Sequence, residues 1–387
     1  MKLNALLMTL ALAVPGLPQA LKLESVMNPA GPGSLQANWS LTREGNALLS
    51  WLDAAKDGSY TLRYSIRRGA QWSEPKTIAA RRKFFRHPAE LPEVMTLNDG
   101  TLMAHWVENP VEESEAEFLY VSSSRDGEHW TAPALAHADK SMVQHGLASM
   151  IASGTREASL FWLEALGGED GPISLKRTIV SGDGKTIKEE SLDKDVCTCC
   201  PTAVVKTARG LLVAYRDHTP EDIRDIAVIR LENDRWTASK IVNADKWKIN
   251  ACPTNAATLS SRGDRVAIAW YTGAQDMPRV QLAFSSDGGT TFGKPVLVST
   301  GHSYGYASVA LNEAGGAIVT WLEQVATGRG TLLLARQISP AGAAGPVLQV
   351  AQGSRQNLGY PRLLQAGNET WLAWGTADPK LQTARLK

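Results

Sequence analysis

Cysteine side chains are concentrated in one short stretch of the sequence. Residues 195–201 read DVCTCCP and contain Cys197, Cys199 and Cys200, while the fourth cysteine, Cys252, lies in INACPTN. A proline follows the last cysteine of both stretches. Thiolates bind soft metal ions, and thiols in an oxidising compartment form disulfides. The stretch therefore predicts either a soft-metal site or one or two disulfides.

The four cysteines allow three complete pairings, and each includes a bridge inside CTCC. They are Cys197–Cys199 with Cys200–Cys252, Cys197–Cys200 with Cys199–Cys252, and Cys199–Cys200 with Cys197–Cys252. A bridge within so short a segment closes a tiny loop, so it constrains the unfolded chain only slightly. One bridge from this segment to Cys252 is a simpler alternative. Cys197 and Cys200 also have the C-x-x-C spacing of a redox pair, so the sequence leaves disulfide, metal and redox interpretations open.

A second stretch, YRDHTPEDIRDI at residues 215–226, is dense in charged side chains and contains a histidine. A carboxylate beside an arginine and a histidine can act as a general acid or base, and arginines can hold an anionic ligand. We take Asp217 as a catalytic candidate. The candidates for ligand binding are Arg216, His218, Arg224 and Asp225.

The elements that must position these residues follow from an internal repeat. An apolar strand that ends in an aromatic residue recurs seven times, at intervals of 51 to 56 residues, with ends at Trp51, Trp106, Trp162, Tyr215, Trp270, Trp321 and Trp374. Each copy is framed by further short strands and turn residues, which is typical of four-stranded propeller blades. The fold class is therefore all-β, a β-propeller for which seven blades are favoured and six are the alternative. The last copy ends after three strands, and the N-terminal segment LKLESV is expected to supply the fourth.

An acidic residue stands two positions after the aromatic in five of the copies: Asp53, Glu108, Glu164, Asp217 and Glu323. A recurring acid is more typical of blade architecture than of catalysis. The residues beyond the repeat pattern are therefore the better functional candidates in the second stretch.

The segments that lead into successive blades should meet around the mouth of the central channel, the usual ligand face of a propeller. Alignment of these segments places His87, His145, Cys200 and Cys252 at comparable positions, together with Tyr306 and Tyr360. This predicts a soft-metal site, with copper favoured over zinc, in which imidazole joins the thiolates. Its expected ligands are Cys197, Cys199, Cys200, Cys252, His87 and His145.

One turn carries a more specific motif. SSDGGTTF, from Ser285 to Phe292, matches the pattern Ser-x-Asp-x-Gly-x-x-aromatic, and SRDGEHW (124–130) and SIRRGAQW (65–72) are degenerate versions of it. On these motifs the chain resembles the sialidase-like, Asp-box propeller superfamily. The resemblance implies that the motif is a folding device between the third and fourth strands of a blade, and that it lies on the face away from the active site.

Sialidases in this superfamily bind a substrate carboxylate with three arginines and use a tyrosine nucleophile. FFRHP (84–88) resembles the motif of the first arginine, which makes Arg86 a candidate, and GYPR offers Tyr360 and Arg362. No residue of the chain matches the middle arginine. The resemblance therefore implies an exo-acting glycoside hydrolase as the alternative to a binding protein.

Charge and the N-terminal segment restrict the remaining possibilities. The chain has 40 basic and 39 acidic residues, so it lacks the positive surplus expected of a nucleic-acid-binding protein. Residues 1–20 have the pattern of a signal peptide, and residues 21–387 are expected to form one propeller domain with no further membrane span. We therefore expect a secreted or periplasmic monomer whose partner is a small ligand, a glycan or a metal ion.

Overall fold

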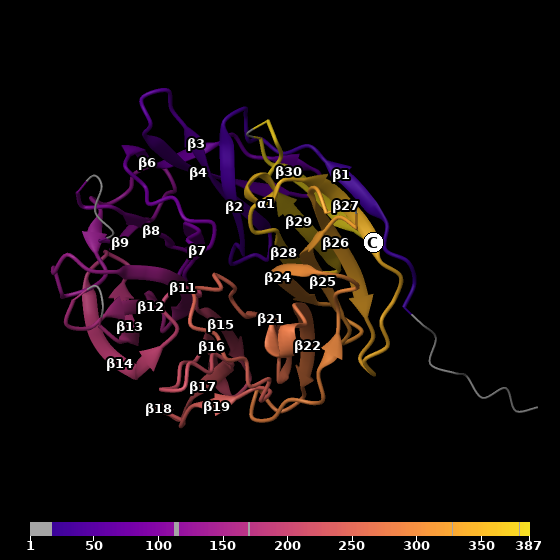
Figure 1. The fold of residues 1–387 in the computed structure, drawn as a ribbon. Helices are drawn as coiled ribbons and strands as arrows, with labels where there is room; N and C mark the ends of the chain where they lie inside the picture. Colours follow the sequence, from indigo (N-terminus) through magenta and orange to yellow (C-terminus); the bar gives the residue numbers. More distant parts are fainter. Residues whose placement is uncertain (1–17, 112–115, 169–170, 327, 379) are drawn as a thin grey trace, which may run out of the picture.

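The chain folds into a ring of seven β-sheets around a central channel (Figure 1). The computed structural model describes residues 18–387 apart from 112–115, 169–170, 327 and 379. The prediction of seven four-stranded blades is confirmed, and the six-bladed alternative is wrong. Nearly all of the predicted signal peptide, residues 1–20, lies outside the described residues. None of the helices found in the described residues is long and apolar enough to cross a membrane.

Each of the first six blades is built from consecutive strands. Blade 1 contains β2 (Ser34–Leu41), β3 (Ala47–Ala54), β4 (Tyr60–Arg68), β5 (Gln71–Trp72) and β6 (Lys76–Arg82). Blade 2 contains β7 (Glu93–Thr96), β8 (Leu102–Glu108), β9 (Phe118–Ser124) and β10 (Ala134–Leu135). Blade 3 contains β11 (His145–Ser153), β12 (Glu157–Ala165), β13 (Ile173–Ser181) and β14 (Thr186–Val196). Blade 4 contains β15 (Ala203–Thr207), β16 (Gly210–Arg216), β17 (Ile226–Glu232), β18 (Arg235–Trp236) and β19 (Lys240–Ile241).

The remaining blades complete the ring. Blade 5 contains β20 (Thr258–Arg262), β21 (Arg265–Thr272), β22 (Arg279–Ser285) and β23 (Val296–Leu297), and blade 6 contains β24 (Ser303–Leu311), β25 (Ala317–Gln324), β26 (Thr331–Ile338) and β27 (Leu348–Gly353). Blade 7 contains β28 (Arg362–Ala366), β29 (Glu369–Trp374), β30 (Gln382–Leu386) and β1 (Leu23–Val26). The short helices are η1 (Ala274–Asp276) and α1 (Arg355–Leu358).

The ring is closed by the N-terminal strand, as the sequence predicts. Strand β1 pairs antiparallel with β30, with Leu23 opposite Leu386. The ladder continues beyond the strands, because the backbone groups of Lys22 and Lys387 exchange two hydrogen bonds of 2.8 and 3.0 Å. Blade 7 therefore combines segments from both ends of the sequence.

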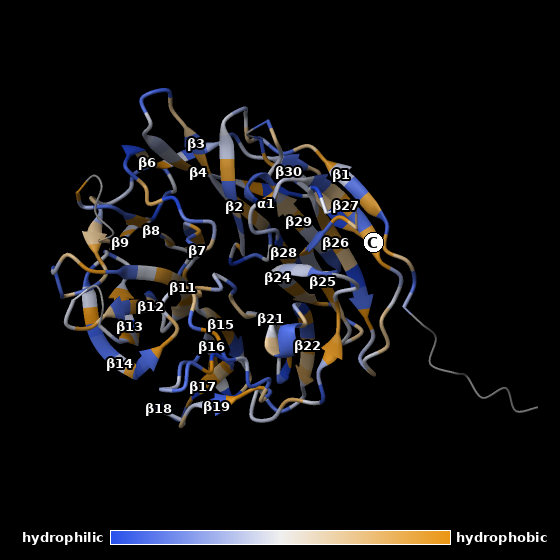
Figure 2. Cartoon of the chain, viewed as in Figure 1, coloured by the Kyte–Doolittle hydropathy of each residue, from blue (hydrophilic) through white to orange (hydrophobic). Residues whose placement is uncertain are grey.

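Apolar side chains of the strands pack between neighbouring blades. The aromatic residues of the repeat lie on the second strand of each blade, and the largest fully buried side chains include Trp51, Trp106, Trp162, Trp270 and Trp321. Figure 2 shows hydrophobic residues along the blade strands and hydrophilic ones along much of the connecting chain. Burial of these surfaces between blades supplies the main driving force for the fold.

The first strands of the blades surround the channel. The channel holds a cavity of about 130 Å³ that receives polar side chains from every blade. They are Asn38, Glu93, Ser149, Thr202, Thr258, Ser308 and Arg362.

The Asp-box turn has the structural role that the resemblance implies. It lies between β22 and β23, and the Asp287 carboxylate accepts hydrogen bonds from Ser285 Oγ at 2.7 Å and from Thr291 N at 2.9 Å. Ser285 Oγ also accepts from Gly289 N at 2.9 Å. The side chains thus satisfy backbone groups that the turn leaves without partners.

Replacement of Asp287 by alanine should lower the free energy of unfolding by about 1–2 kcal/mol, because turn donors lose their acceptor. Chemical denaturation of the parent and the variant measures this difference. Ser286→Ala, at the exposed neighbouring position, is the matched control and should leave stability unchanged. Equal stabilities of the Asp287 variant and the parent would contradict the assigned role.

Candidate functional site

The cysteine segment connects β14 of blade 3 to β15 of blade 4, and Cys252 lies in the connection from blade 4 to blade 5. Cys199 and Cys252 form a disulfide with a Cα–Cα distance of 5.8 Å. A bridge from the cysteine segment to Cys252 is the simpler arrangement expected from the sequence, and it fixes the two connections to one another. Two of the three complete pairings are therefore excluded, and only the pairing that joins Cys199 to Cys252 remains compatible with the structure.

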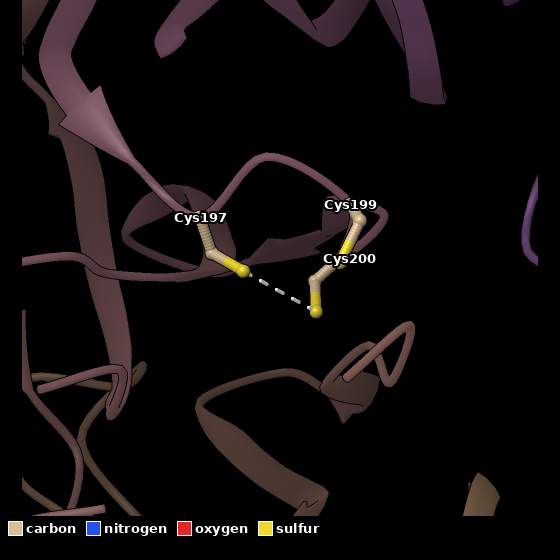
Figure 3. Close-up of side chains that lie close together, drawn as sticks. All are labelled: Cys197, Cys199 and Cys200. Carbon is tan, nitrogen blue, oxygen red and sulfur yellow. Dashed lines mark hydrogen bonds between the residues drawn. The ribbon is translucent and has the colours of Figure 1, made fainter. Parts of the chain in front are cut away.

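Cys197 and Cys200 remain as unbonded thiols, and we refer to them as the thiol pair. Both are 1% exposed, and their Sγ atoms lie 3.7 Å apart. Figure 3 shows the two side chains directed toward one another. Asn255 N donates a hydrogen bond of 3.4 Å to Cys200 Sγ. The structure thus brings together two buried sulfur atoms that have no covalent partner.

The surroundings of the thiol pair shift the pKa values of its two thiols in opposite directions. The pKa of Cys197 is lowered by its hydrogen bond with Cys200 and by the positive charges of Arg216 and Arg224, whose combined effect exceeds that of burial. The Nη1 atom of Arg224 lies 3.5 Å from Cys197 Sγ. Burial raises the pKa of Cys200, and the neighbouring Cys197 raises it further. Cys197 is therefore the member of the pair that more readily becomes a thiolate.

Arg216, a predicted ligand-binding residue, is bound within the protein. Its terminal nitrogens donate to the backbone carbonyls of Arg224, Asn255 and Tyr271 at 2.7, 3.0 and 2.9 Å. Its guanidinium also lies over the Trp247 ring, 5.0 Å from the ring centre. Arg216 thus joins blades 4 and 5, and its positive charge acts on Cys197 of the thiol pair.

His218 lies between two carboxylates beside the cysteine segment. Its Nδ1 atom is 2.7 Å from Asp195 Oδ1, and its Nε2 atom is 3.4 Å from Asp222 Oδ1. Burial alone would lower the pKa of His218, but the hydrogen bonds with these carboxylates raise it. The side chain is 23% exposed, so it remains accessible from the solvent.

The two predicted acids of this loop differ in their surroundings. The Asp225 carboxylate accepts hydrogen bonds from the backbone N–H groups of Lys246 and Trp247 at 2.8 and 3.0 Å, so it holds a turn. Asp217 is half-buried, and burial raises its pKa to about 6. Asp217 is therefore the acid of this pair that can exchange a proton near neutral pH.

The residues that resemble sialidase motifs fall in two places. Tyr360 and Arg362 line the channel cavity, whereas Arg86 is exposed and donates to Tyr60 Oη at 3.0 Å. The Tyr360 hydroxyl is bonded to two backbone groups of the segment before β20, and burial raises its pKa. Arg362 Nε donates to Asn38 Oδ1 at 3.1 Å. Arg86 is thus not among the residues that line the channel with the other two.

The predicted histidine ligands lie outside the cysteine group. The His87 ring stacks on Phe85, and its Nδ1 atom accepts a long hydrogen bond from Ala89 N. His145 is fully buried and belongs to a second group of potential metal ligands. The structure therefore does not bring the two histidines together with the cysteines, because each ring packs within its own blades. In the described part of the chain, the cysteine group brings together the sulfur atoms of Cys197, Cys199 and Cys200 alone. Because the predicted ligands Cys199 and Cys252 form the disulfide, only Cys197 and Cys200 remain as thiols.

The sequence did not predict that the residues of the second group lie together. It consists of Asp139, His145 and Glu164, whose ligand atoms all lie within 4.8 Å of one another. Glu164 belongs to the recurring acids that the repeat assigns to architecture, and nothing in the sequence around Asp139 singles it out. The proximity of Glu164 to His145 follows from the register of β11 and β12, in which the two residues are directly opposed.

A seven-bladed ring with Asp-box turns defines this molecule as a sialidase-like β-propeller. The sequence matches the family described as BNR repeat-like domain over residues 53–372, and the chain belongs to that family. The family resemblance inferred from the Asp-box is thereby confirmed. Comparison with curated protein sequences gave no significant match.

Solved structures with this fold include proteins that act on or bind carbohydrates. The lectin BP39L from Burkholderia pseudomallei is 14% identical, with a TM-score of 0.63 and coverage of 91% of this chain and 96% of the lectin. The GH93 α-L-arabinofuranosidase of Fusarium graminearum is 11% identical, with a TM-score of 0.52 and coverage of 94% and 97%. A PL25 ulvan lyase is 10% identical, with a TM-score of 0.56 and coverage of 93% of both chains. At these identities the comparisons establish the fold, and function has to be argued from the site.

Proposed function

We propose that this protein is an exported propeller that binds a soft metal ion at the thiol pair. The favoured ion is Cu(I). The observation that carries the proposal is the pair itself, two buried and unbonded sulfur atoms 3.7 Å apart beside a formed disulfide. Soft thiolate ligands select Cu(I), and Zn(II) is the alternative ion. The disulfide and the N-terminal apolar segment support export, because disulfides persist in oxidising compartments.

The arginines fit this role. Binding of a monovalent ion by two thiolates leaves one net negative charge in a buried site, which would be unfavourable without compensation. Arg224 contacts Cys197 Sγ, and Arg216 supplies a second positive charge nearby. His218 and Asp217 lie in the loop after β16, next to the cysteine segment, where they are accessible to an incoming ligand.

We expect one Cu(I) per chain in protein prepared under reducing conditions, and loss of that ion in Cys197→Ser and in Cys200→Ser. Elemental analysis and competition with a Cu(I) chelator measure both. The double variant Cys199→Ser/Cys252→Ser lacks the disulfide but keeps the thiol pair, so it is the matched control and should still bind. Absence of stoichiometric copper in the parent would overturn the proposal. Discovery of a Cys197–Cys200 disulfide in the native protein would instead favour the redox interpretation.

The alternative proposal is an exo-acting glycoside hydrolase of the sialidase type. It is supported by the family match and by the arabinofuranosidase among the structures of the same fold. Under this proposal Tyr360 and Arg362, which line the channel cavity, would carry the reaction; the other two candidates from the sequence, Arg86 and Asp217, do not line that cavity. Turnover of a fluorogenic sialoside that depends on Arg362 would support it, and turnover that survives Arg86→Ala and Arg362→Ala would exclude the sialidase mechanism.

A further inference from the structure

Blade 3 departs from the repeat at its acidic position. In three other blades the acid two residues after the tryptophan accepts the indole N–H of that tryptophan; these acids are Asp53, Glu108 and Glu323. In blade 3 the Trp162 indole donates instead to Thr178 Oγ1 at 3.0 Å. Glu164 is thereby released from the architectural role that its counterparts have.

Glu164 is directed at His145, its cross-strand partner. Glu164 is 4% exposed, and its two carboxylate oxygens have different surroundings. Lys176 Nζ lies 3.0 Å from Oε2, whereas Oε1 makes no hydrogen bond and lies 3.8 Å from His145 Nε2. A buried carboxylate oxygen without a donor is unfavourable, so its surroundings call for a cation.

The tautomer of His145 adds a second acceptor to the same place. Its Nδ1 atom lies 3.0 Å from the backbone carbonyls of Glu117 and Val143, and carbonyls only accept, so Nδ1 carries the proton. In the neutral imidazole Nε2 then presents a lone pair. This nitrogen is buried and makes no hydrogen bond. His145 Nε2 and Glu164 Oε1 are therefore two buried polar atoms that face one another without a hydrogen bond.

Asp139 completes the group from the connection between blades 2 and 3. Its Oδ2 atom lies 3.8 Å from His145 Nε2, and Ser141 Oγ donates to the same oxygen at 2.7 Å. His137, whose ring stacks on His145 at 4.0 Å, is bonded through Nδ1 to the backbone carbonyl of Asp139. The Asp139 side chain is 46% exposed, so it forms the solvent side of an otherwise buried group.

The distances exclude direct hydrogen bonds and leave room for an ion. Hydrogen-bonded nitrogen and oxygen atoms lie within about 3.2 Å of one another. Two ligands that are each about 2.0–2.1 Å from a tetrahedral ion are about 3.4 Å apart. The two separations of 3.8 Å at His145 Nε2 are longer than a hydrogen bond, and each would shorten by about 0.4 Å around a tetrahedral ion.

We propose that Asp139, His145 and Glu164 form a site for a divalent transition-metal ion, with Zn²⁺ as the best match. One imidazole and two carboxylates are borderline and hard ligands, and they leave a further coordination position toward solvent at Asp139. The carbonyl groups on His145 Nδ1 orient the ring, as in protein metal sites generally. The site is chemically distinct from the thiol pair and does not depend on copper binding there.

Zinc binding should be measured in the Cys197→Ser/Cys200→Ser background, because the thiols could also take up zinc. Titration with ZnCl₂ after removal of metal by a chelator is expected to give one Zn²⁺ per chain and an upward shift of the thermal midpoint. Asp139→Asn and Glu164→Gln should each weaken binding about tenfold or more. Glu323→Gln changes the equivalent acid of blade 6, so it is the matched control and should bind zinc like the background protein.

A parallel measurement covers the case in which the cysteine variant does not fold. In the otherwise unaltered protein, Asp139→Asn should lower the number of bound zinc ions by one, because Asp139 is exposed and its replacement should not disturb folding. Absence of stoichiometric zinc would overturn the site, as would equal affinity of the Asp139 and Glu164 variants and the Glu323 control.

Discussion

Replacement of Arg216 by methionine is expected to lower the free energy of unfolding by about 3–5 kcal/mol, because several buried carbonyls lose their donors. Arg216 is 2% exposed, and it bonds the carbonyls of Arg224, Asn255 and Tyr271. Each of these acceptors lies in or beside the interface of blades 4 and 5. Methionine fills much of the volume but donates no hydrogen bond.

Chemical denaturation of the parent and the Arg216 variant measures this loss. Arg209→Met is the matched control, since Arg209 is half exposed and forms a surface ion pair with Asp264. That change should alter stability by no more than about 0.5 kcal/mol. If the Arg216 variant were as stable as the control, Arg216 would be available for a ligand, and the original prediction of a ligand-binding arginine would regain support.

Glu90→Gln is expected to make the protein more stable than the parent at pH 8 and about equally stable at pH 4. Glu90 is 2% exposed; its Oε2 atom accepts a hydrogen bond from Leu147 N, and its Oε1 atom makes none. Burial raises the pKa of this carboxyl from 4.5 to about 7, although the nearby His105 opposes the shift. Because the pKa of Glu90 is higher in the folded than in the unfolded protein, its contribution to stability is fully present below pH 4.5. That contribution is lost as the pH rises through about 7.

The difference between the two proteins should reach about 3–4 kcal/mol above pH 7, since the pKa of Glu90 rises from 4.5 to about 7 and each pH unit corresponds to about 1.4 kcal/mol. Denaturation curves at pH 4 and pH 8 measure it. Glu313→Gln, at an exposed position paired with Arg262, should show no such dependence. A stability difference that is the same at both pH values would show that Glu90 does not ionise in this window.

The number of blades and their strand order could be predicted because the residues that form the repeat are the ones buried between blades. Each of the seven aromatic positions, such as Trp106, lies on a second strand between two blades, so the packing imposes the same pattern seven times. The Asp-box turn was predictable for a similar reason, since Asp287 satisfies local backbone groups that any such turn exposes. Local and periodic requirements leave a signal in the sequence.

The arrangement of the site was less predictable because it depends on where single side chains point. The sequence places Arg216 beside the cysteines, but the direction of its guanidinium is set by carbonyls of the next blade. Likewise, Glu164 follows the acidic pattern of its counterparts, and only the position of Thr178 on the neighbouring strand shows that it has a different partner. To choose among the three complete cysteine pairings, one must know which residues of two connections, far apart in the sequence, lie close together in the fold.

The pairing of β1 with β30 has a consequence for the order of folding. A ribosome makes Leu23 early and Leu386 only after the other six blades, so the last sheet cannot be completed during most of synthesis. Until then the edge of β1 has no partner, and unpaired edges promote association between chains. Contacts of such large sequence separation also form slowly. Because both ends meet in one sheet, a circular permutant that joins them and opens the chain at an exposed turn in another blade should retain the ring.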